Sequence, residues 1–115
     1  MGRFDIAIIG AGPGGISAAI TAKIRGKSTL FLGKRGGGKL EKAHAIQNYP
    51  GFPNVSGADL SKAFMDHIDS MGIEITEARV SMVYPMGDYF SIQAGENIYE
   101  ATTVILATGV VAGKT

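Results

Sequence analysis

A glycine-rich turn near the start of the chain has the residue types and the spacing that bind a dinucleotide. It reads Gly10-Ala11-Gly12-Pro13-Gly14-Gly15, a G-x-G-x-x-G pattern. Gly10 permits a tight turn, Gly12 lets the backbone approach a pyrophosphate, and Gly15 lets a helix pack closely on a strand. A helix that begins here presents free N–H groups and the positive end of its dipole to the phosphates. The turn therefore predicts a pyrophosphate site built from Gly10, Gly12, Pro13, Gly14 and Gly15.

The segments on either side of the turn must place it between a strand and a helix. Residues 4–10 form an apolar run that suits a strand buried on both faces. Apolar residues then recur at helical spacing over residues 16–24, and Gly26 follows as a helix stop. Residues 28–32 predict a second strand, parallel to the first and joined to it by a right-handed crossover. This order of elements predicts an α/β fold.

The second half of the chain predicts one more helix and then mostly strands. Ser56 and Asp59 resemble a capping box at the start of a helix that ends at Gly72. A short strand is expected over residues 73–76. An antiparallel meander is expected next, with strands over residues 80–84, 89–94 and 98–102. A buried strand over residues 103–107 then ends at Thr108-Gly109, so the chain returns to the parallel sheet.

Size and composition limit the classes of function. The chain has 115 residues, which fits one domain but is short for a complete dinucleotide-dependent enzyme. The net charge of +1 argues against nucleic acid or a membrane surface as a partner. No apolar run approaches the roughly 20 residues that span a bilayer, and Met1 leads directly into a strand, so the cytoplasm is the expected location. Because the sequence has no Cys, the chain itself cannot perform dithiol–disulfide exchange.

Two further motifs narrow the class of dinucleotide-binding protein. Gly37-Gly38-Lys39-Leu40 is followed, after five residues, by Ile46-Gln47-Asn48-Tyr49-Pro50-Gly51-Phe52-Pro53. Together with the late Ala107-Thr108-Gly109, these motifs resemble the FAD domain of low-molecular-weight thioredoxin reductases, which are two-dinucleotide-binding flavoproteins. The resemblance implies a Rossmann-like FAD-binding domain, in which a parallel sheet with helices is joined by an antiparallel β-meander.

The resemblance also implies which residues contact FAD. Leu40 and Asn48 are expected near the isoalloxazine ring, because in the family these loops run along the flavin and its ribityl chain. The other cofactor-binding positions expected are Lys34, Lys39, Val80, Ala107, Thr108 and Gly109, of which Lys34 and Lys39 are expected from their charge and not from the family pattern. No catalytic residue and no metal site are expected in this chain. His44 is expected in an exposed loop and His67 at the edge of the apolar face of the second helix.

The sequence departs from the family pattern at two places. The second strand of such domains usually ends in an acid that binds the ribose hydroxyls, but here it runs into Gly33, Lys34 and Arg35. The two basic residues could instead meet a 2′-phosphate, so NADP stays open as an alternative cofactor. Lys39 stands where the family has Gln, and it is either solvated or a cation that stabilises the reduced flavin.

The resemblance assigns residues 1–115 to the N-terminal part of an FAD-binding domain. The NAD(P)-binding domain, which carries the redox-active C-x-x-C in the family, and the C-terminal FAD segment are absent from it. The implied function is to pass electrons through FAD to a protein disulfide, with NADPH or ferredoxin as electron donor and a thioredoxin-like protein as substrate. The exposed sheet edge of such a part predicts a homo-oligomer. A stand-alone NAD(P)-binding module and a non-catalytic truncated scaffold are the alternatives.

Overall fold

The computed structural model describes residues 2–35, 46–47, 49–51 and 53–108. Its elements, in chain order, are β1 (Phe4–Ile9), α1 (Pro13–Ile24), β2 (Thr29–Leu32), α2 (Gly57–Ser70), β3 (Val80–Pro85), β4 (Phe90–Ala94) and β5 (Asn97–Leu106). The five strands form one sheet in the order β2-β1-β5-β4-β3. The expected α/β architecture, with a parallel sheet and an antiparallel meander, is therefore present.

The sheet joins its parallel and antiparallel halves through β5. Strand β1 pairs in parallel with β2 on one side and with β5 on the other. Strand β4 pairs in the antiparallel sense with both β5 and β3. The expectation of separate strands over residues 98–102 and 103–107 is wrong, because both segments belong to the single strand β5. Its first half completes the meander, and its second half extends the parallel sheet beside β1.

Two other expectations about the strands also need correction. Residues 73–76 do not form a strand, and only Thr76 makes a bridge, in parallel with Leu32. The end of β5 is also less buried than its apolar sequence predicts, since the Leu106 side chain is 71% exposed. No described strand lies on the outer side of this part of β5, which explains the exposure.

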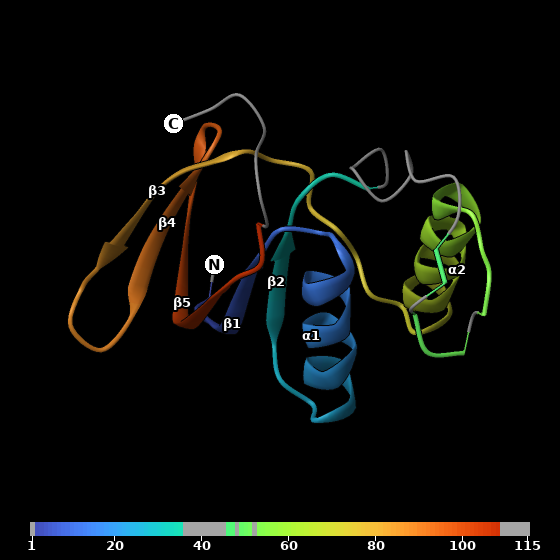
Figure 1. Ribbon diagram of the computed structural model, residues 1–115. Coiled ribbons are helices and arrows are strands. Elements are labelled where there is room, and N and C mark those ends of the chain that lie inside the picture. Colours follow the sequence, from blue (N-terminus) through green and yellow to red (C-terminus); the bar gives the residue numbers. More distant parts are fainter. Residues whose placement is uncertain (1, 36–45, 48, 52, 109–115) are drawn as a thin grey trace.

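Apolar residues pack in two layers, one on each face of the β1–β2 pair. Helices α1 and α2 cover one face, where Ile8, Phe31, Ile16 and Ile68 are among the buried residues. The meander covers the other face, where Ile92 of β4 lies in one buried cluster with residues of β1 and β2. Figure 1 shows the helices and the meander on opposite sides of these two strands. The sheet therefore curls so that its antiparallel half packs on its parallel half.

The helix ends follow local rules that the sequence shows. The Ser56 side chain accepts a hydrogen bond from the N–H of Asp59 at 3.1 Å, which caps α2 as expected. Gly26 and Gly72 both have φ of +71°, a backbone conformation that ends a helix and that glycine adopts most easily. Helix α1 begins at Pro13, within the glycine turn, where the motif places its amino end. The apolar periodicity starts only at Ile16, after the glycines.

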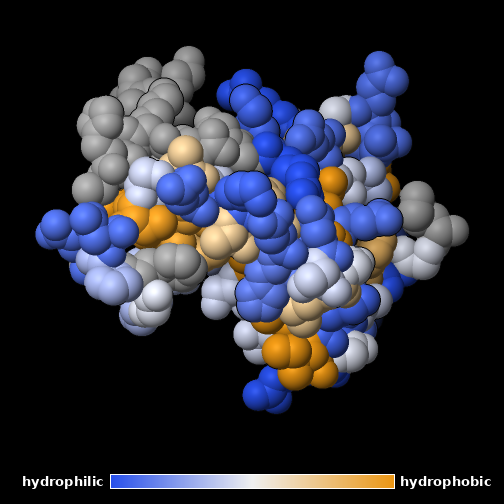
Figure 2. All heavy atoms as spheres, turned by 90° about the vertical axis from the view of Figure 1, so that its right-hand side faces the viewer, coloured by the Kyte–Doolittle hydropathy of each residue, from blue (hydrophilic) through white to orange (hydrophobic). Residues whose placement is uncertain are grey.

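The surface over the helices is mainly hydrophilic, with hydrophobic side chains in separate patches (Figure 2). Neither described helix has the length and apolar character needed to cross a membrane.

At the start of β1 and β2, Asp5 and Ser28 exchange two hydrogen bonds, in which each side chain accepts from the other residue's N–H. The hydrogen bond from the Ser28 backbone lowers the pKa of the Asp5 carboxyl.

We expect the core between the meander and the parallel strands to determine stability. Ile92→Ala removes a side chain with 0% exposure and should lower the free energy of unfolding by about 2–5 kcal/mol. Ile98→Ala, on the adjacent strand, removes a side chain that is 64% exposed and should change it by less than about 0.5 kcal/mol. Urea denaturation measures both values, and equal losses would contradict the layered packing.

Candidate functional site

Gly10 directly follows β1, beside Ala107, which directly follows β5. Its φ is +112°, which is open to glycine and rarely adopted by other residues. A Cβ at this position would overlap the carbonyl group of Ala107. The N–H of Ala107 also donates to the carbonyl of Ile9 at 2.8 Å, so the segment Ala107-Thr108 is held beside the turn. The structure thus brings the two expected sites, Gly10 and Ala107, together.

Gly15 has the packing role that its place in the motif predicts. A Cβ there would overlap the Gly10 carbonyl oxygen and lie 3.4 Å from the ring of Phe31 on β2. Because Gly15 has no Cβ, the first turn of α1 packs directly against the end of β1. The predicted reason for this glycine, close packing of helix on strand, is what the geometry shows.

The amino end of α1 is open and suited to an anion. Gly12 is the N-cap residue, and a Cβ built on it would meet no atom of the described residues within 4 Å. Within the part of the chain that the structure describes, no side chain caps this helix end, and the first turn of the helix contains no acidic residue. The first hydrogen bond within the helix runs from the N–H of Ile16 to the carbonyl of Gly12. The N–H groups of Gly14 and Gly15 therefore have no carbonyl partner within the helix and can bind phosphate oxygens.

Gly33, at the carboxyl end of β2, packs against the glycine turn. A Cβ at this position would lie 2.8 Å from both the backbone nitrogen and the Cβ of Ala11. Any side chain here requires the turn to move. This close approach gives a physical reason for the absence of the usual ribose-binding acid at Gly33.

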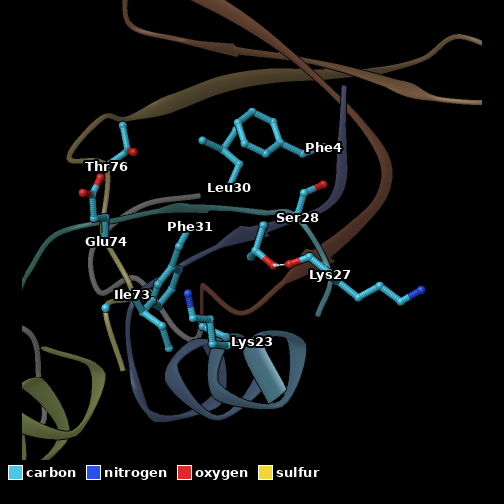
Figure 3. A pocket seen from close by; sticks show the side chains of 12 residues that line it. Phe4, Lys23, Lys27, Ser28, Leu30, Phe31, Ile73, Glu74 and Thr76 are labelled. Carbon is cyan, nitrogen blue, oxygen red and sulfur yellow. Dashed lines mark hydrogen bonds between the residues drawn. The ribbon is translucent and has the colours of Figure 1, made fainter. Parts of the chain in front are cut away.

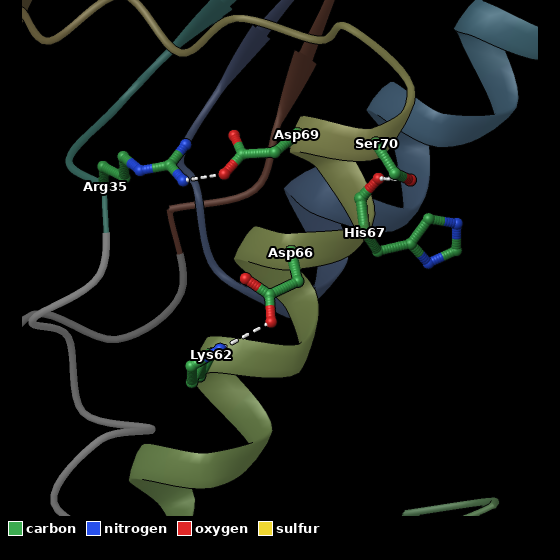
Figure 4. A network of polar contacts seen from close by, with 6 residues as sticks. All are labelled: Arg35, Lys62, Asp66, His67, Asp69 and Ser70. Carbon is green, nitrogen blue, oxygen red and sulfur yellow. Dashed lines mark hydrogen bonds and ion pairs between the residues drawn. The ribbon is translucent and has the colours of Figure 1, made fainter.

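The two basic residues that follow Gly33 behave differently. Lys34 is exposed. The Arg35 guanidinium forms an ion pair with Asp69 of α2 at 2.5 Å (Figure 4), and this hydrogen bond raises the pKa of Arg35 above its ordinary value. The backbone N–H of Arg35 donates to Glu77 at 3.2 Å. Since Arg35 already has an acidic partner, its guanidinium is a poor candidate for a 2′-phosphate. Sequence reasoning did not identify Asp69 or Glu77, because both are distant from Arg35 in the chain.

The remaining expected site residues lie elsewhere or outside the described residues. Val80 starts β3 and packs against the core between the meander and the parallel strands. Tyr49 packs edge-on against Phe64 of α2, with 5.3 Å between ring centroids. Lys39, Leu40, Asn48 and Gly109, as well as His44, lie outside the described residues. Their expected contacts with the flavin therefore remain predictions.

The sequence predicted that His67 packs at the edge of the apolar face of the second helix, and this prediction is wrong. It is exposed, and Figure 4 shows its ring directed away from the pair of Arg35 and Asp69. The Ser70 hydroxyl donates to the backbone carbonyl of His67 at 2.6 Å. Among the described residues, no three His, Asp or Glu side chains gather closely enough to hold a metal ion.

A cavity of about 390 Å³ lies along β2, from Lys27 and Ser28 at its amino end to Phe31 and Thr76 (Figure 3), and its described lining includes no residue of the glycine turn. Ser28, Lys27 and Lys23 line it together with Glu74. Ligands of open α/β sheets bind at the carboxyl ends of the strands. We therefore assign the dinucleotide to the glycine turn and not to this cavity.

Comparison with known proteins is consistent with this geometry. A family model described as pyridine nucleotide-disulphide oxidoreductase matches residues 4–115. The chain belongs to this family. It is 35% identical to a thioredoxin reductase of Bacillus subtilis over 108 residues, which cover 92% of this chain and 34% of that protein. The chain thus spans about a third of the length of this curated relative.

Solved structures agree in fold. A ferredoxin-flavin thioredoxin reductase from Clostridium acetobutylicum superposes with a TM-score of 0.95 at 47% identity, over 100% of this chain and 40% of that one. A thioredoxin reductase from Lactococcus lactis superposes with a TM-score of 0.88 at 32% identity, over 97% of this chain and 37% of that one. The expected fold class, the relation to thioredoxin reductases and FAD as the cofactor are confirmed.

We expect Gly15→Ala to destabilise the fold, because its Cβ overlaps the Gly10 carbonyl oxygen and that atom belongs to the backbone. A loss of about 2 kcal/mol or more in the free energy of unfolding is the expected size. Gly12→Ala is the matched control, since its Cβ has open space, and it should change stability by less than about 1 kcal/mol. Urea denaturation of both variants measures these changes in the free energy of unfolding. A Gly15→Ala protein that is as stable as the wild type would contradict the close packing of α1 on the end of β1.

Proposed function

We propose that this chain is the first part of the FAD-binding domain of a thioredoxin-reductase-like enzyme. The observation that carries the proposal is the open, uncapped amino end of α1 beside Gly10 and Ala107. The donor set there consists of backbone N–H groups, and the first turn of α1 contains no acidic residue, which fits a pyrophosphate. Gly10, Gly12, Pro13, Gly14 and Gly15 are the residues that would hold it.

FAD, when bound, supplies the exchange of electrons between a donor and a disulfide. The residues of this chain bind and orient it. In the proposal, Ala107 and Thr108 border the pyrophosphate, and Lys34 and Val80 lie toward the adenosine. Lys39, Leu40, Asn48 and Gly109 take the positions that the family resemblance gives them. The sequence has no Cys, so none of these residues can supply a thiolate for exchange with the disulfide.

The rest of the enzyme must supply the dithiol. The chain covers 34% of its Bacillus subtilis relative and 40% of the Clostridium acetobutylicum structure. We assign the NAD(P)-binding domain and the C-terminal FAD segment to the part that it does not cover. The outer edge of β5 is suited to contact that part, because β4 pairs with β5 only as far as Ala101, and Leu106 beyond it is exposed. The same open edge favours self-association when the chain is alone.

The proposed substrate is a disulfide of a thioredoxin-like protein, and the proposed location is the cytoplasm. The candidate electron donors are NADPH and ferredoxin. Identity is 47% to the ferredoxin-flavin thioredoxin reductase and 35% to the Bacillus subtilis thioredoxin reductase. This difference supports ferredoxin as the donor. A separate NADP-binding role has less support, because Arg35 is paired with Asp69.

Gly12→Asp tests the assignment of the pyrophosphate site. A carboxylate at this position repels phosphate, while the open space around Gly12 lets the side chain fit without unfolding the chain. We expect the wild-type chain to take up added FAD and become yellow, and the variant to remain colourless at an unchanged melting temperature. FAD uptake that survives the substitution would show that the phosphates bind elsewhere.

A chimera tests the activity of the whole enzyme. This chain would replace the matching 40% of the Clostridium acetobutylicum reductase, to which it is 47% identical. We expect the chimera to bind FAD and to reduce a thioredoxin disulfide with reduced ferredoxin. The same chimera with Gly12→Asp is the control and should be inactive. A folded, flavin-loaded chimera that cannot reduce the disulfide would contradict the proposed activity.

A further inference from the structure

The carboxyl end of β2 lacks an acid of its own, but a carboxylate from another part of the chain lies beside it. The N–H of Thr76 donates to the Phe31 carbonyl at 2.7 Å, and the N–H of Gly33 donates to the Thr76 carbonyl at 3.1 Å. These two bonds hold Thr76 parallel to the last residues of β2. The next residue, Glu77, is therefore carried to the same edge of the sheet as the glycine turn.

The position of the Glu77 carboxylate is defined by one hydrogen bond. Its Oε2 accepts from the backbone N–H of Arg35 at 3.2 Å. Among the described residues, no hydrogen bond is formed by the other oxygen, Oε1, and the carboxylate is exposed to solvent. The Arg35 guanidinium forms its ion pair with Asp69 and not with Glu77. Glu77 thus keeps accepting capacity and a negative charge at the end of β2.

We infer that Glu77 binds the ribose hydroxyls of the adenosine half of FAD, an inference that rests on the proposed function. In dinucleotide domains this task belongs to an acid at the end of the second strand, close to the pyrophosphate turn. Gly33 cannot hold one here, because a Cβ would lie 2.8 Å from Ala11 of that turn. Glu77 reaches the same end of β2 from the neighbouring segment, and a carboxylate can accept from two hydroxyls.

The charge of Glu77 also bears on the choice of cofactor. Asp69 contacts the Arg35 guanidinium and Glu77 accepts from the Arg35 backbone N–H, so two carboxylates contact one of the residues that the sequence suggested for a 2′-phosphate. A phosphate placed there meets like charges, whereas a ribose with free hydroxyls finds acceptors. The arrangement therefore selects FAD, whose ribose carries a free 2′-hydroxyl, against NADP.

The test compares two pairs of ligands: FMN lacks the AMP part of FAD, and 2′-deoxy-ADP lacks only the ribose 2′-hydroxyl of ADP. The dissociation constants of FAD and FMN, and of ADP and 2′-deoxy-ADP as competitors of FAD, are measured on the wild-type chain and on Glu77→Gln. The wild type should bind 2′-deoxy-ADP about tenfold more weakly than ADP, as expected for the loss of a hydrogen bond to a charged group. In Glu77→Gln, the ratio of the dissociation constants of 2′-deoxy-ADP and ADP should fall to about twofold. The variant should also bind FAD about tenfold more weakly than the wild type, while its affinity for FMN should be unchanged.

Glu74→Gln is the matched control, because Glu74 belongs to the same segment but lines the cavity along β2. It should change none of the four constants. An unchanged ADP ratio in Glu77→Gln, or equal losses for FAD and FMN, would overturn the inference and leave FAD binding by the glycine turn intact. A wild-type chain that binds no FAD would overturn the proposed function itself, and the inference with it.

Discussion

The contacts of Gly10 with Gly15 and Ala107 hold the site together. The backbone of Ala107 at the end of β5 lies against Gly10, and the Gly10 carbonyl oxygen lies against Gly15 at the start of α1. Neither Gly10 nor Gly15 has room for a Cβ, so three elements meet at a distance that only glycine permits. This junction places the uncapped end of α1 beside the carboxyl ends of β1 and β5. The proposed anion site follows from this packing and needs no charged side chain.

Much of this junction could be predicted from the sequence, because its determinants are local. The glycine spacing, the apolar runs of β1 and β2 and the Ser56 cap of α2 each act within a few residues. The predictions from the sequence are wrong where strand pairing between residues far apart in the chain determines the structure. Whether residues 98–107 form one strand or two depends on β1 and β4 together. The weak pairing of residues 73–76 likewise depends on how closely they approach β2.

The acidic residues at the end of β2 show the same limit. The missing acid at Gly33 is visible in the sequence, but its cause, the approach of Ala11, is a contact across the fold. Glu77 and Asp69 are more than thirty residues from Arg35 and carry no motif, so nothing in their local sequence marks them. Their position argues against the basic Lys34-Arg35 pair as a site for a 2′-phosphate. Arg35 serves to join β2 to α2, and the adjoining surface is suited to hydroxyls and not to a phosphate.

The central claim is that the glycine turn binds the pyrophosphate of FAD, and the most direct measurement is a crystal structure of the chain with FAD. We expect pyrophosphate oxygens about 2.7–3.2 Å from the backbone nitrogens of Gly14 and Gly15. We also expect the isoalloxazine ring at the carboxyl edge of the parallel strands. A pyrophosphate bound instead at the amino end of β2, beside Lys23 and Lys27, would contradict the account.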